Sequence, residues 1–64
     1  MEQNEMINLI NQLVNGEIQE IAIKKSDFLT FRQIIVARED FKHIRGIAQH
    51  GGDVIYTYSE IARS

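Results

Sequence analysis

The 64-residue sequence contains no cysteine and no proline. Without cysteine, the chain has no disulfide, no thiolate zinc site and no thiol nucleophile. Small secreted domains usually depend on disulfides, so we expect a soluble protein in the cytoplasm. A chain this short has room for one hydrophobic core, and no proline-marked linker divides it. We therefore expect residues 1–64 to form a single domain.

Long apolar runs and a basic overall charge are also missing. No apolar stretch approaches the roughly 18 to 20 residues that cross a bilayer, so no membrane partner is expected. The formal net charge of −2 argues against nonspecific DNA binding. The charge is nevertheless uneven along the chain. Residues 1–23 carry four glutamates without Lys or Arg, whereas residues 24–50 carry six Lys or Arg against three acidic residues.

Two segments have the apolar periodicity of amphipathic helices. In the first, apolar residues recur at helical spacing and end before Asn15-Gly16, a typical helix stop: Met6, Leu9, Ile10, Leu13 and Val14. The second stripe follows Ser26-Asp27, which offers an N-cap and a first-turn acid, and consists of Phe28, Phe31, Ile34 and Ile35. We place the end of this second helix near Arg38.

The remaining segments alternate with a period of two, as strands do. A first strand is predicted over residues 17–24, and a hairpin over residues 43–49 and 53–59. A three-residue loop at residues 50–52 pairs Gln49 with Asp53 and places one face of apolar side chains together. In this register Gly46 lies opposite Tyr56, whose ring can cover the bare backbone.

These elements predict an α+β fold of the order α-β-α-β-β. Two helices pack on one face of a three-stranded, mainly antiparallel sheet. The other face, called the open face below, then carries a semi-apolar set that we interpret as an interaction surface: Ile18, Ala22, Ile47, Ile55 and Thr57.

Chemical motifs are sparse. Glu39 and His43 have a metal-like i, i+4 spacing, but they lack a convergent third ligand. His50 stands beside Gly51-Gly52 without a paired nucleophile, and turns select these residue types for backbone reasons. The sequence has no phosphate loop, no GxSxG and no GxGxxG. We therefore expect no catalytic residues, no metal and no cofactor, and hence a protein that is not an enzyme.

Two functions are compatible with this pattern. The first is a small protein-interaction or regulatory module, a homodimer or a partner of another protein, in which the acidic N-terminal and basic middle segments complement each other. The alternative is a nucleic-acid-binding domain that contacts phosphate through basic residues between 32 and 45: Arg32, Arg38, Lys42 and Arg45. Against the alternative, Glu39 and Asp40 interrupt the basic segment.

Overall fold

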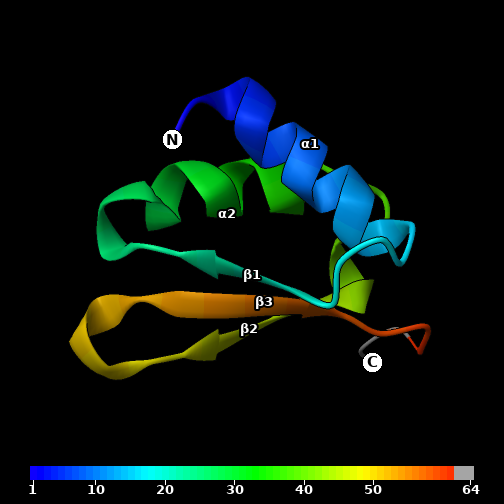
Figure 1. Cartoon of the computed structure of the whole chain (residues 1–64). Helices are drawn as coiled ribbons and strands as arrows, with labels where there is room; N and C mark the ends of the chain where they lie inside the picture. Colours follow the sequence, from blue (N-terminus) through cyan, green and yellow to red (C-terminus); the bar gives the residue numbers. More distant parts are fainter. Residues whose placement is uncertain (62–64) are drawn as a thin grey trace.

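The computed structural model describes residues 1–61, which form two helices and a three-stranded antiparallel sheet (Figure 1). In chain order, the elements are α1 (Gln3–Val14), β1 (Glu20–Ile23), α2 (Phe28–Val36), β2 (Ile44–Ala48) and β3 (Val54–Tyr58). The predicted α+β class and α-β-α-β-β order are confirmed. No helix within residues 1–61 is long and apolar enough to cross a membrane.

Helix α1 ends where the sequence predicts. The Gly16 N–H donates to the Leu13 carbonyl at 3.2 Å, and the Glu17 N–H donates to the Gln12 carbonyl at 2.9 Å. Gly16 has a φ of +82°, the left-handed conformation that closes many helices. The chain therefore turns back toward the sheet directly after Val14.

The sheet has the strand order β1-β3-β2, and its hairpin has the predicted register. Gly46 lies opposite Tyr56, and the Gln49 N–H donates to the Asp53 carbonyl at 2.7 Å. Gly51 and Gly52 in the three-residue loop have φ values of +81° and +91°. Positive φ is accessible to glycine at no steric cost, so this loop can turn tightly enough to hold the pairing.

The hydrophobic core lies between the sheet and the two helices, which are on the same side of it (Figure 1). Helix α1 packs against α2, β1 and β3. At the centre, the Phe31 and Tyr56 ring centroids are 4.8 Å apart. The buried core residues come from all five elements: Met6, Ile10, Leu13, Ile21, Ile23, Phe31, Ile35, Ile44 and Tyr56.

Two boundary predictions differ from the structure by two residues or more. Strand β1 begins at Glu20 rather than residue 17, so Ile18 lies before the sheet and packs against the core. Helix α2 ends at Val36 rather than near Arg38, because the Arg38 N–H donates to the Ile35 carbonyl in a tighter turn. Ser26, which the sequence suggests as the N-cap of the second helix, lies inside the 3-10 turn Lys25–Asp27, and no side chain caps α2. The Asp27 carboxylate lies 3.3 Å from the amino group of Met1.

Candidate functional site

Strand β2 is the part of the sheet that the helices leave uncovered. Along β1, exposed and buried residues alternate, as expected for a strand with one face on the core. In β2 only Ile44 is buried, and the next four residues are all exposed. Two of these, Gly46 and Ala48, are on the helix side of the sheet, where little side chain is available for packing. The helices thus bury the start of β2 at Ile44 but not the helix side of the strand beyond it.

A groove of about 340 Å³ lies between α2 and β2. We call it the β2 groove. Its volume falls in the range of ligand and side-chain pockets. The α2 side is formed by Phe28, Ile35 and Val36, and Phe41 lies in the turn before β2. Gly46, Ala48 and Tyr56 line the sheet side. The lining is therefore mainly apolar.

Arg32 is the charged side chain of the β2 groove. No ion pair joins it to an acidic side chain within residues 1–61. Burial raises the pKa of the Tyr56 hydroxyl above its ordinary value, and the nearby positive charge of Arg32 partly opposes this shift. Tyr56 is therefore neutral at physiological pH, and the groove carries one positive charge.

The outer edge of β2 has backbone groups that no strand pairs within the described part of the chain. On the inner side, the Ser59 N–H donates to the His43 carbonyl at 2.7 Å, and Gln49 bonds Asp53. Hydrogen-bonding direction alternates along an antiparallel strand, so the odd-numbered residues of β2 bond β3. The N–H and C=O groups of Gly46 and Ala48 and the C=O group of Ile44 consequently point outward from the sheet, whereas the Ile44 N–H donates to the Phe41 carbonyl.

The open face contains four of the five residues that the sequence suggests for interaction. Ala22, Ile55 and Ile47 form one row across the three strands, since Ile55 is opposite both others. Thr57 lies in the next row, between Glu20 and Arg45. Ile47 is 53% exposed, which makes it the largest free apolar surface of β2. Ile18 is separate from these four, since it lies outside the sheet.

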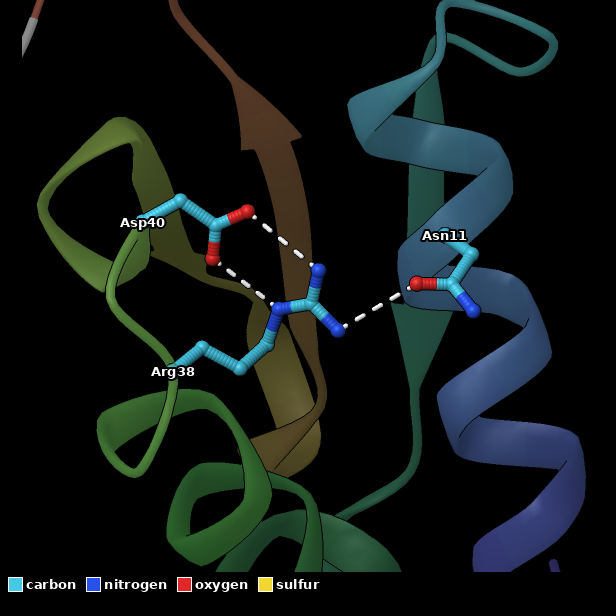
Figure 2. Close-up of polar contacts among 3 residues, drawn as sticks. All are labelled: Asn11, Arg38 and Asp40. Atoms are coloured by element: carbon cyan, nitrogen blue, oxygen red, sulfur yellow. Dashed lines mark hydrogen bonds and ion pairs between the residues drawn. The ribbon is translucent and has the colours of Figure 1, made fainter.

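Arg38 binds two neighbours of its own rather than a free surface. Its guanidinium donates to both oxygens of Asp40, at 2.9 and 3.2 Å, and to the Asn11 side chain at 3.3 Å (Figure 2). The hydrogen bonds from Arg38 hold the pKa of Asp40 below its ordinary value. This network ties the turn after α2 to α1. A role in phosphate binding would require Arg38 to leave these partners.

The other basic residues of the nucleic-acid hypothesis do not share one face. Arg32 lies in the β2 groove on the helix side of the sheet, whereas Arg45 lies on the open face beside Thr57. Lys42 is in the 3-10 turn Phe41–His43 that precedes β2. The basic segment of the sequence is therefore distributed around β2.

The spacing of Glu39 and His43 does not produce a shared helical face, because α2 ends before both of them. Within residues 1–61, no group of three His, Asp or Glu side chains is placed to hold a metal ion. His43 instead lies against the ring of Tyr58, with 5.5 Å between the ring centroids. Its Nδ1 is 2.8 Å from the Ser59 carbonyl oxygen.

The β2 groove was not predicted from the sequence, although part of its signal was visible there. The predicted register already placed Gly46 and Ala48 on the helix side, and both lack bulky side chains. What the sequence did not show is how far α2 extends over the sheet. That position depends on contacts between residues far apart in the chain.

Comparison with known proteins identifies the family. Residues 3–57 match the family described as YkzS-like protein, which covers all five elements except the last residue of β3. The chain belongs to this family. No curated protein and no solved structure matches it. The family description states no activity, so a function for this YkzS-like chain has to be argued from the geometry around β2.

Proposed function

We propose that this chain is a small protein-interaction module that self-associates through β2. The observation that carries the proposal is the exposure of four consecutive residues in a strand that is hydrogen bonded on one side. Such a strand offers a partner both backbone groups and apolar side-chain surface. Neither catalysis nor a cofactor is part of the proposal.

The composition of β2 supports this role. Unpaired edge strands readily pair with other chains, and proteins that avoid this use charges, proline or bulges on the edge. Arg45 is the one charged residue between Ile44 and Ala48, and proline is absent. Apolar surface flanks the edge on both sides, with Ile47 on the open face and the β2 groove on the helix side. Covering both surfaces would remove apolar area from water, which favours association.

The test is the molecular mass in solution, measured by sedimentation velocity over a range of protein concentrations. We expect a concentration-dependent dimer. Ile47→Lys should abolish association because it places a second charge on the β2 edge, whereas Ala22→Lys is the matched control on the same face of β1. A monomer at every concentration would contradict self-association. Equal loss in both variants would move the contact from β2 to the whole open face.

Salt separates an apolar contact from an ionic one. Because the surfaces beside β2 are mainly apolar, association should persist or strengthen in high salt. If the acidic N-terminal region and the basic residues carried the contact, the dimer should dissociate as ionic strength rises.

A nucleic-acid-binding domain remains the alternative, supported by the basic residues Arg32, Lys42 and Arg45 around β2. Adding short mixed DNA and RNA duplexes and single strands to the same preparation tests it. This alternative would be favoured if binding weakened steeply with salt. The dependence of log affinity on log salt concentration should then become less steep in Arg32→Ala or Arg45→Ala. A cytoplasmic location is proposed with both functions, on the ground that the chain has no cysteine.

A further inference from the structure

We infer that the partner at β2 is a second copy of this chain, bound antiparallel, with the two-fold axis at Gly46. The inference rests on the proposed self-association and specifies its geometry. Two three-stranded sheets would join into one six-stranded sheet through their β2 edges. Gly46 would lie opposite Gly46 of the second copy, and Ile44 opposite Ala48 of the second copy.

The direction of the free backbone groups selects β2 against β2. Residues opposite each other in an antiparallel pair have side chains on the same face. The outward backbone groups of β2 belong to Ile44, Gly46 and Ala48, whose side chains are on the helix side. Pairing β2 with its own copy therefore places the helices of both copies on one side of the joined sheet.

Pairing β2 with β1 of a second copy gives a different result. The odd residues of β3 bond β2, so its even residues bond β1, opposite Ile21 and Ile23. Ala22 then directs its backbone outward, and its side chain is on the open face. An antiparallel β1 to β2 contact would put the two helix layers on opposite sides and leave the β2 groove uncovered. Such a contact would also leave a free β1 edge and a free β2 edge, so further copies could add to it instead of forming a closed dimer.

The β2 groove indicates why a whole second copy fits better than an isolated strand. With both helix layers on one side, the two β2 grooves adjoin across the new seam. Gly46 and Ala48 have so little side chain that α2 of the second copy can approach them. Val36, which is 48% exposed at the edge of the groove, would then be covered along with Ile47 on the open face. A lone peptide strand would supply the backbone bonds without a second helix layer.

Charge and hydrogen bonding together select the register. An axis at Gly46 pairs Gly46 with its copy and the Ala48 N–H with the Ile44 C=O of the second copy, and it places Arg45 opposite Ile47 of the second copy. An axis at Arg45 would set two guanidinium groups opposite each other at the closest cross-strand spacing, which is destabilising. An axis at Ile47 would move Ile44 beyond the end of the partner's β2 and lose its hydrogen bonds.

Cysteine cross-linking tests this register, and no natural thiol can form a competing disulfide, because the natural chain contains no cysteine. In the Gly46-centred register, positions 45 and 47 of two copies form a pair without mutual hydrogen bonds, and their Cα atoms approach to about 4.5 Å. That separation is close enough for a disulfide. Within one chain the two Cβ atoms are on the same side of the strand and about 6.6 Å apart, beyond the roughly 3.5 to 4.5 Å that a disulfide spans, so an internal disulfide is disfavoured.

Three variants are compared during mild oxidation: the double variant R45C/I47C and the single variants R45C and I47C. Both positions are exposed, so the variants should fold, which circular dichroism checks. We expect the double variant to form covalent dimers at least about tenfold faster than either single variant. Rapid cross-linking of R45C alone or of I47C alone would place the axis at Arg45 or at Ile47 and overturn the inference.

The same preparations separate the two proposals. Sedimentation velocity on the natural chain reports association independently of the thiols. A dimer whose double variant does not cross-link would overturn the β2 to β2 geometry and leave self-association standing. A chain that is monomeric at every concentration would overturn both.

Discussion

The two edges of the sheet belong to strands of similar length but have opposite environments. At β1, Ile21 and Ile23 are buried beneath the helices at 4% and 0% exposure. At β2, every residue after Ile44 is exposed, on the helix side as well as on the open face. The difference shows that a position on the core side of a sheet is buried only where a second layer extends over it. Of the two edge strands, β1 thus holds more of the buried apolar surface, while β2 stays exposed beyond Ile44.

The largest expected difference in stability comes from replacing one isoleucine by alanine at each edge of the sheet. Ile23→Ala should lower the free energy of unfolding by about 2 to 5 kcal/mol, because it leaves a cavity in the core. Ile47→Ala should cost less than about 1 kcal/mol, since its side chain is half exposed. Urea unfolding at low protein concentration, where association contributes little, measures both. Equal losses would mean that β2 is not a peripheral strand.

A smaller effect on stability is expected at Gly46, where neighbouring side chains lie close to the β2 backbone. A Cβ at Gly46 would lie 3.0 Å from Tyr56 Cε1 and 3.2 Å from Val54 Cγ1. Tyr56 in turn packs against the ring of Phe31. Gly46→Ala should therefore destabilise the fold by about 1 to 2 kcal/mol through overpacking, although a less flexible unfolded chain offsets part of the cost.

Ala48→Val is the matched control for Gly46→Ala. It adds bulk to the same face of the same strand, two residues further on, where the side chain is exposed. Its effect on unfolding should stay within about 0.5 kcal/mol. A stabilised Gly46→Ala variant would show that the Tyr56 ring can shift, and that the helix side of β2 is not closely packed at this point.

The smallest effect tests the link between α1 and the turn that leads to β2. Arg38 lowers the pKa of Asp40 below its ordinary value of 3.8 in the folded state. A lowered folded-state pKa adds stability at pH values above 3.8, and this stability is lost as the pH falls through the folded-state value. Arg38→Gln should cost less than about 1 kcal/mol at neutral pH, and unfolding should depend less on pH below 3.8.

Glu39→Gln is the control for the pH measurement. It removes the exposed carboxylate next to Asp40 but leaves the Arg38 hydrogen bonds in place. Its unfolding free energy below pH 3.8 should therefore follow that of the natural chain. If Arg38→Gln and the natural chain gave the same pH dependence, the network in Figure 2 would not stabilise the fold.

Local patterns were sufficient for most of the fold. The apolar periodicity around Ile10, the glycine stop after Val14 and the glycine-rich turn at residues 50–52 are short-range signals, and all agree with the structure. The prediction was wrong at Ile18, which packs against the core from outside the sheet. It was also two residues long at the end of α2, where no glycine marks the stop.

The candidate site was predicted in part. Ala22, Ile47, Ile55 and Thr57 share the open face because side chains alternate along strands of known register. The sequence also grouped Arg38 with Arg32 and Arg45, whereas the structure engages Arg38 with Asp40 and Asn11. Adjacency in sequence could not separate these roles, because Asn11 is 27 residues away from Arg38.

The sequence by itself determined which segments are helices and strands, and which hairpin residues face each other. These features follow from backbone preferences and from side-chain periods of 3.6 and 2 residues. Tertiary structure decided that the helices cover β1 and β3 but leave β2 open, and that a groove remains beside Gly46. Helix placement over a sheet is the result of many distant side-chain contacts, and no local pattern encodes their sum.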